Sequence, residues 1–217
     1  MLNSGVPDPV RHRIHKFILR QRPTHGLAIS ICLASIIATA AGLPPWWEAF
    51  LSVPRVQAAF LQTSESAVFG KLKRKGSVRL AKSGRLHVIY EDGLELVADG
   101  QSLIQYDPDT RTAQRMDLVA ASLETPLLRL LTDPSKLGRT YAIEASGKGQ
   151  VRLKPLNQSL PEIQIQGAGN LPRRLAWTDA SGASQVLELL DAKVPAKDFP
   201  AGTFRFTPPK GTRWLGR

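Results

Sequence analysis

The chain has 217 residues, of which 42% are hydrophobic and 22% charged, enough for one globular domain with a real core. Its formal net charge of +11 suits nucleic acid, an anionic membrane surface or an acidic protein partner. The densest basic group, at 71–75, contains no aromatic residue, and basic charge alone does not read bases, so we expect no nucleic-acid binding.

The first forty residues predict an export signal. Residues 11–22 are basic, and an apolar run follows from Leu27 to Ala41. The run is shorter than the ~20 residues that span a bilayer, but it fits the core of a signal peptide. Ala38-Thr39-Ala40 has the small-x-small pattern of a cleavage site, so we expect a signal peptide at 1–40, cleaved after Ala40, and a single domain at 41–217. An uncleaved membrane anchor is the alternative.

Cys32 is the only cysteine, and it lies inside the apolar run. A lipoprotein signal needs a small residue directly before its cysteine, and Ile31 stands there, so we expect no lipid anchor. The predicted mature part then has no cysteine and folds in an oxidising compartment without disulfides.

A helix is predicted directly after the signal. The prolines at 44–45 suit its first positions, and Trp46, Phe50 and Val53 recur at intervals of three and four residues. Pro54 should end or kink it.

A long series of short strands follows, separated by turn-forming residues. Two apolar-rich runs flank Asp99-Gly100, which predicts a hairpin with a type I′ turn and positive φ at both turn residues. Further strands are expected around 78–80, 86–90, 141–144, 150–154, 161–167, 171–178, 184–190 and 203–207. About ten or eleven strands, mostly antiparallel because their connections are short, predict a sandwich or barrel.

The segment 122–131 is predicted as a short helix that is apolar nearly all round. Thr125 suits the N-cap and Pro126 the first helical position, and the leucines that follow leave only Arg129 polar. Such a helix must be buried nearly all round or move between two burial sites. A core helix that plugs a barrel and a lid over an apolar cavity are the two interpretations. The residues of the lid would be Thr125, Pro126, Leu127, Leu128, Leu130 and Leu131.

No catalytic or metal-binding set emerges from the sequence. His87 is the only histidine outside the predicted signal, and strand alternation predicts an outward position for it. One histidine without cysteines cannot build a His/Cys zinc site. A Ser–His pair with His87 as base, in a hydrolase, is the weaker alternative. We therefore expect no enzyme, no metal and no cofactor.

The hairpin region contains the string Ala98-Asp99-Gly100-Gln101-Ser102-Leu103-x-x-Tyr106-Asp107-Pro108. This string resembles the Asp-Gly hairpin of the LolA family of periplasmic outer-membrane lipoprotein carriers, and further motifs resemble that family in consistent order. Thr125-Pro126-Leu127-Leu128-x-Leu130-Leu131 resembles its Thr-Pro lid helix, and Val56-x-Ala58-x-Phe60-x-Gln62 its N-terminal Phe-x-Gln motif. Leu175-x-x-x-Asp179-x-x-Gly182 and the ending Phe204-x-Phe206-x-Pro208-Pro209-x-Gly211 complete the series.

The resemblance implies a mainly β fold with short helices, an incomplete antiparallel β-barrel covered by a helical lid. It also implies a monomeric periplasmic carrier that holds lipoprotein acyl chains, takes them from an inner-membrane release complex and delivers them to an outer-membrane acceptor. A related lipid or glycolipid as cargo, or an envelope interaction module that binds none, remain alternatives. The candidate cavity residues are Phe60, Leu80, Leu86, Val88, Tyr90, Leu103 and Ile163.

The sequence departs from the family pattern at the residue that latches the lid. The family often has an arginine before a proline there, whereas the nearest match is Lys82-Ser83. Lysine lacks the bidentate fork of arginine. Lys82 is therefore the candidate for the lid latch, with a different hydrogen-bonding geometry.

Overall fold

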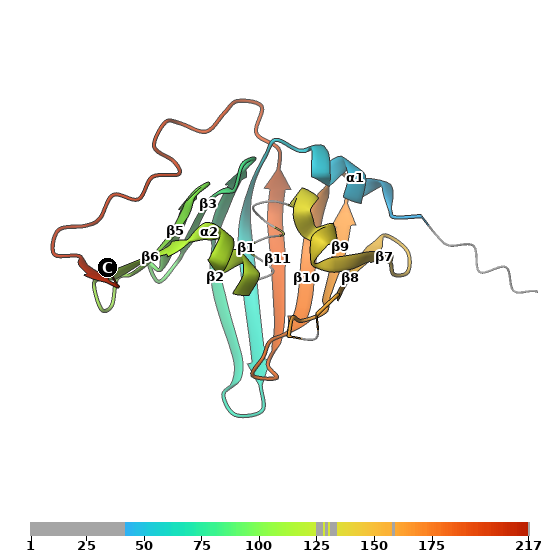
Figure 1. Cartoon of the computed structure of the whole chain (residues 1–217), viewed down its shortest axis with the longest axis horizontal. Helices are drawn as coiled ribbons and strands as arrows, with labels where there is room; N and C mark the ends of the chain where they lie inside the picture. Colours follow the sequence, from blue (N-terminus) through green and yellow to red (C-terminus); the bar gives the residue numbers. More distant parts are fainter. Residues whose placement is uncertain (1–41, 125–127, 129, 131–133, 158, 217) are drawn as a thin grey trace, which may run out of the picture. The chain divides into compact units, whose positions relative to one another are not determined.

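The structure, a computed structural model, describes residues 42–124, 128, 130, 134–157 and 159–216 (Figure 1). All of them belong to the unit Ala40–Arg217. The predicted signal and its cleavage site lie outside the described residues, as do Thr125, Pro126, Leu127 and Leu131 of the predicted lid. No helix in the described ranges is long and apolar enough to cross a membrane.

The described residues form a mainly β fold, one open sheet in which twelve strands are assigned, so the expected ten or eleven is too low. The order is β12-β6-β5-β4-β3-β2-β1-β11-β10-β9-β8-β7. All neighbours pair antiparallel except β12 and β6, which are parallel. The strands are β1 Arg55–Ser66, β2 Gly70–Ala81, β3 Arg85–Tyr90, β4 Glu95–Asp99, β5 Ser102–Asp107, β6 Thr112–Asp117, β7 Tyr141–Ala145, β8 Gln150–Pro155, β9 Ile163–Ala168, β10 Leu171–Thr178, β11 Ser184–Lys193 and β12 Arg213–Leu215.

Helix α1, Pro45–Ser52, confirms the predicted N-terminal helix. Trp46, Trp47 and Phe50 are buried, and the helix contacts β9 and β10. A Cβ at Gly167 of β9 would lie 2.1 Å from the Trp46 ring, so only glycine lets the indole lie against that strand. The ring is also held by a hydrogen bond of 3.0 Å from its Nε1 to the carbonyl of Gly149.

The hairpin of β4 and β5 is where Asp99-Gly100 predicts it, but the predicted turn geometry is wrong. Only Gly100 has positive φ, at 103°. Asp99 instead accepts hydrogen bonds from the backbone N–H groups of Gln101 and Ser102, at 2.9 and 2.8 Å. The aspartate side chain closes this turn, because it satisfies backbone donors that the strand ladder leaves open.

Helix α2, Leu118–Glu124, begins earlier than the predicted helical segment. The Asp117 carboxylate caps it by accepting a hydrogen bond of 2.9 Å from the N–H of Ala120. Leu118 and Ala121 are buried in the main core. Further along, Leu128 and Leu130 are helical, and their side chains are 7% and 0% exposed. A 3₁₀ helix, η1 Pro134–Arg139, buries Leu137 completely.

The predicted strand at 203–207 is wrong, because these residues form a turn and an irregular segment. The segment crosses the sheet on its way to β12 (Figure 1). Phe206 packs on Tyr106, with ring centroids 5.5 Å apart, and on Trp214, at 6.1 Å. Side-chain packing rather than a strand ladder holds this part of the chain.

Candidate functional site

The sheet separates two pockets that lie on its opposite faces. Neighbouring residues along a strand point to opposite sides. On β5, Leu103 lines one pocket and Ile104 the other, and on β4 the same holds for Leu96 and Val97. The two pockets therefore share strands but no surface.

The first pocket is apolar and has a volume of about 820 Å³. This lies within the ~300–1,000 Å³ usual for ligand sites. Its floor is one face of the sheet, here called the inner face, from β1 to β6 and from β9 to β11, and Ala121 and Leu128 contribute to its helical side. Phe60 and Tyr90 meet edge to face within it, with centroids 5.1 Å apart.

Six of the seven candidate cavity residues line this apolar pocket: Phe60, Leu86, Val88, Tyr90, Leu103 and Ile163. Leu80 does not, although it is 4% exposed and belongs to the same core. On β2 the pocket is lined by Val78, two residues away on the same face. Of the predicted lid, Leu128 lines the pocket, and Leu130 is buried in the core without lining it.

The sequence analysis did not identify the residues of β11 that line the apolar pocket. Leu187 and Leu189 line the pocket, and the register places them opposite Gln62 and Phe60 of β1. The alternation of the 184–190 run identified a strand, but only the pairing with Phe60 identifies its inner face. The other residues missed on the lining are Gln62, Val78, Leu96, Gln105, Met116, Ala121, Ser159, Leu160, Pro161, Trp177, Thr178, Asp179 and Ala180.

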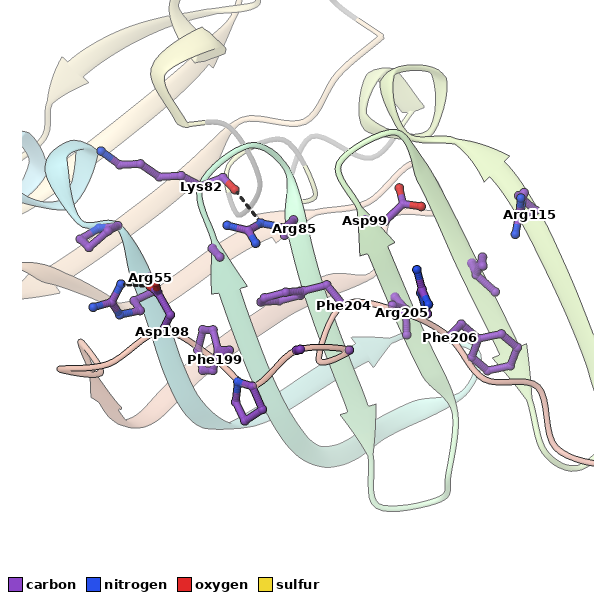
Figure 2. Close-up of a pocket in the computed structure, with 17 residues that line it drawn as sticks. Arg55, Lys82, Arg85, Asp99, Arg115, Asp198, Phe199, Phe204, Arg205 and Phe206 are labelled. Atoms are coloured by element: carbon purple, nitrogen blue, oxygen red, sulfur yellow. Dashed lines mark hydrogen bonds and ion pairs between the residues drawn. The ribbon is translucent and has the colours of Figure 1, made fainter.

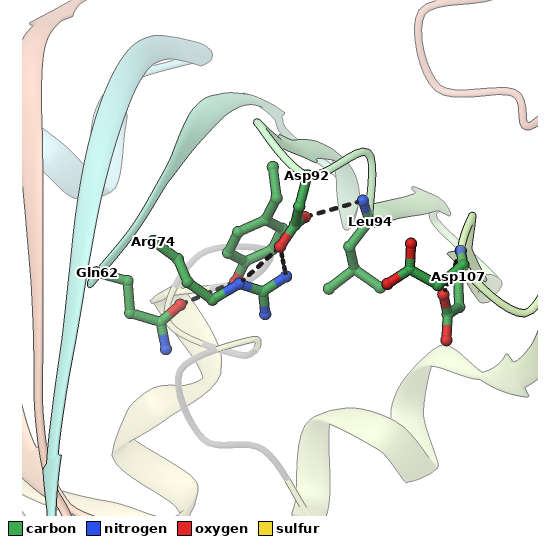
Figure 3. Close-up of polar contacts among 7 residues, drawn as sticks. Gln62, Arg74, Asp92, Leu94 and Asp107 are labelled. Carbon is green, nitrogen blue, oxygen red and sulfur yellow. Dashed lines mark hydrogen bonds and ion pairs between the residues drawn. The ribbon is translucent and has the colours of Figure 1, made fainter. Parts of the chain in front are cut away.

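One end of the pocket is polar (Figure 3). Tyr90 donates a hydrogen bond of 2.9 Å to Oε1 of Gln62. The Arg74 guanidinium lies 4.1 Å from the centroid of the Tyr90 ring and donates to Asp92, at 2.6 Å from Nη2 to Oδ2. Asp92 also accepts from the N–H of Leu94 at 3.2 Å.

The pKa values of Tyr90 and Asp92 are shifted in opposite directions. Burial raises the pKa of the Tyr90 hydroxyl, and the nearby Arg74 charge offsets only part of that effect. Hydrogen bonds from Arg74 and Leu94 hold the pKa of Asp92 below its ordinary value. At neutral pH, Tyr90 is therefore a neutral hydrogen-bond donor and Asp92 a carboxylate.

The second pocket, of about 920 Å³, is charged (Figure 2). It lies between the outer face of the sheet and the segment that carries Phe199 and Phe204. Lys82 lines it, with an exposed side chain in the turn after β2. Lys82 therefore lies away from the lining of the apolar pocket, and its role as a lid latch stays a prediction.

His87 also lies on the outer face. Its Nε2 is 2.7 Å from Oε1 of Glu95, and the side chain is 13% exposed. The strand alternation thus predicted the right face, but the ring is mostly buried there and pairs with a carboxylate. Within the described residues, no group of three or more His, Cys, Asp and Glu side chains is placed to hold a metal ion.

An open antiparallel sheet with an apolar pocket on one face is an architecture that binds apolar ligands. The family model described as "Outer membrane lipoprotein carrier protein LolA" matches residues 52–207. The chain belongs to the LolA family. Its members are periplasmic carriers and are not enzymes, so the predicted family and the predicted absence of enzymatic activity are confirmed.

Two relatives from the genus Bordetella show how far individual sequences of the family differ from this chain. An outer-membrane lipoprotein carrier protein of Bordetella bronchiseptica is 32% identical over 124 residues, 54% of this chain and 57% of the relative. The chain thus matches little more than half of that relative's length. The corresponding protein of Bordetella avium is 27% identical over 192 residues, 83% of this chain and 90% of the relative.

Solved structures resemble the chain at lower identity. A LolA superfamily protein from Nitrosomonas europaea has a TM-score of 0.44 at 12% identity, covering 74% of this chain and 96% of that one. An uncharacterized conserved protein from Thermus thermophilus has a TM-score of 0.49 at 13% identity, covering 77% of this chain and 93% of that one.

Proposed function

We propose that this chain carries the acyl chains of lipoproteins through the periplasm in the apolar pocket. The observation that supports this most is the pocket of about 820 Å³, lined by aliphatic and aromatic side chains from both halves of the sheet, in a member of the LolA family. Cargo would be received from an inner-membrane release complex and passed to an outer-membrane acceptor.

Apolar burial supplies the binding free energy in this proposal. Each methylene buried contributes ~0.8 kcal/mol. Binding therefore needs no specific hydrogen bond along the acyl chain. Release needs a receiver that offers the chain a better apolar site. At the polar end of the pocket, Gln62 and Tyr90 would face the more polar part of a cargo molecule, with the Arg74 guanidinium against the Tyr90 ring.

The helical residues that follow α2 act as a lid in this proposal. Leu128 lines the pocket at 7% exposure, whereas Leu130 is fully buried in the core. Both leucines thus belong to the core, and Leu128 alone also borders the cavity. A cover attached in this way can open toward cargo and remain joined to the domain. Lys82 is retained as its candidate latch.

The export signal completes the proposal. Cleavage after Ala40 would release a single domain at 41–217 into the periplasm, where the LolA family acts. N-terminal sequencing of the protein recovered from fractionated cells tests this step. A membrane-retained chain that begins near Met1 would contradict it.

Two variants on β11 test the cargo site. Leu187 lines the apolar pocket, whereas Leu190 is 45% exposed and does not. We expect Leu187→Gln to weaken binding of a dansyl-labelled fatty acid and of a triacylated lipopeptide, because a polar amide would then face the acyl chain. Leu190→Gln, the matched control on the same strand, should bind like the wild type. Equal binding by both variants, with intact melting curves, would refute the site.

A further inference from the structure

The hairpin of β1 and β2 ends in an apolar tip that no neighbouring strand covers. Val68 and Phe69 are 81% and 89% exposed, and Leu72, two residues into β2, is 59% exposed. The tip is ordered by its own geometry: Gly70 has a φ of 66°, and the N–H of Phe69 donates to Oγ of Ser66 at 3.0 Å. Large apolar side chains are thus displayed at an ordered position.

The tip protrudes beyond the rest of the sheet (Figure 1). Strand β3 pairs with β2 from Gly76 onward, and the N–H of Glu91 donates to the carbonyl of Lys75 at 2.9 Å, so on this side Gly70–Arg74 has no strand neighbour in the described sheet. Four residues separate Gln62, at the polar end of the apolar pocket, from Ser66, where β1 ends. At ~3.3 Å per residue, Ser66 therefore lies about 13 Å from Gln62 along β1, one residue past Glu65, the level that the pocket lining reaches through Thr178 of β10.

Three lysines stand on one side of the hairpin directly behind the tip. Lys71, Lys73 and Lys75 alternate with Leu72 and Arg74 along β2, so they share the outer face of the sheet. All three are exposed. Lys71 pairs with Glu65, whose Oε2 lies 3.7 Å from its Nζ. Arg74 is on the other face, where it pairs with Asp92.

Lysines on an open edge also protect a sheet from pairing with another chain. That role accounts for the charges but not for Val68 and Phe69, because an exposed phenylalanine promotes association. Apolar side chains at a tip with cations behind them fit the interface of an anionic bilayer. There the apolar groups enter the acyl boundary and the ammonium groups meet the phosphates.

We propose that the β1–β2 tip, Val68 to Leu72, docks the protein on an anionic phospholipid surface. The lysines at 71, 73 and 75 supply the attraction, and Phe69 enters the bilayer interface. Docking would bring the polar end of the apolar pocket near the membrane. The proposal depends on the exposure and charge of the tip, not on the identity of the cargo.

A tryptophan at the tip tests the proposal. Full-length protein carrying Phe69→Trp is mixed with vesicles of phosphatidylcholine and phosphatidylglycerol with brominated acyl chains, and wild-type emission is subtracted. Leu156→Trp is the matched control, because Leu156 is 65% exposed in the connection after β8. We expect a blue shift and bromine quenching at position 69 and neither at position 156.

The contribution of the three lysines is tested with the same tryptophan at position 69. Each basic residue at an anionic surface changes partitioning about fivefold, so Lys71→Gln, Lys73→Gln and Lys75→Gln together should weaken it about a hundredfold. The protein with all three lysines intact should bind vesicles of phosphatidylcholine alone about as weakly as the triple variant binds the anionic vesicles. Melting curves and fatty-acid binding, measured on each variant, separate loss of docking from loss of the fold or the cargo site.

Three results would overturn the proposal. One is no quenching at position 69. Another is equal quenching at positions 69 and 156. The third is a blue shift at position 69 that grows with protein concentration without vesicles, which would identify a second copy of the chain as the occupant of the tip.

Discussion

Replacing Leu128 with aspartate separates a lid from a core helix. Leu128 borders the apolar pocket, so a carboxylate there can keep its hydration by facing the cavity. The same change at Leu130, which is 0% exposed, puts a charge where no water reaches it. We therefore expect Leu128→Asp to keep a cooperative melt and Leu130→Asp to lose it.

The expected loss of binding follows from the burial of the acyl chain. If the aspartate denies the cargo the burial of about three methylenes, at ~0.8 kcal/mol each, binding weakens by ~2.4 kcal/mol. This corresponds to about 60-fold in Kd. The assay is titration with a dansyl-labelled fatty acid, run beside circular dichroism melting. Loss of the cooperative melt in both variants would refute the lid and support a plain core helix.

Three further predictions concern residues that hold the helices and the polar end of the pocket in place. Gly167→Ala should destabilise the domain by ~1–3 kcal/mol, because the new Cβ would clash with the indole ring of Trp46. Gly138→Ala is the control, because a Cβ there meets nothing within 4 Å, and denaturant melts compare the two variants. Arg74→Gln should raise the pKa of Asp92 toward its ordinary value, as measured by NMR titration of the carboxyl group. In the wild type, the stability that the Arg74–Asp92 pair contributes is present at pH values above the ordinary pKa of an aspartate. It is lost as the pH falls through the lowered pKa of Asp92. Asp117→Ala should cost ~0.5–2 kcal/mol in the same melts, because α2 loses its cap.

The alternation of apolar residues along a strand predicted which of its residues share a face, but not how far the pocket extends along that face. Leu86, Val88 and Tyr90 share a face because their spacing is two, and the structure lines the apolar pocket with that face. Leu80 belongs to the same face but not to the lining. How far along a strand the pocket extends depends on pairing register and on the covering helices, and neither is encoded in one strand's pattern.

The helices show where local signals compete. Asp117 caps α2, which therefore begins earlier than the segment predicted as a helix, where Thr125 was the expected N-cap. At Asp99-Gly100 the turn was placed correctly, but the aspartate closes it with its side chain instead of adopting positive φ. In both cases a carboxylate that accepts backbone N–H groups decided the local structure.

The C-terminal part could not be read from periodicity. Phe204 and Phe206 alternate with Arg205 like residues of a strand, yet no ladder forms. Phe206 is instead held by the rings of Tyr106 and Trp214. Alternation reports that one side of a segment is apolar, and that side can pack on a sheet as well as belong to one.

Native mass spectrometry of the wild-type protein, recovered from the periplasm of its own cells, tests the central claim most directly. We predict a population that carries an acylated lipoprotein, released when the protein is denatured and reduced by Leu187→Gln but not by Leu190→Gln. A protein that is always empty, or that carries the same mass in both variants, would contradict an acyl-chain carrier built on the apolar pocket.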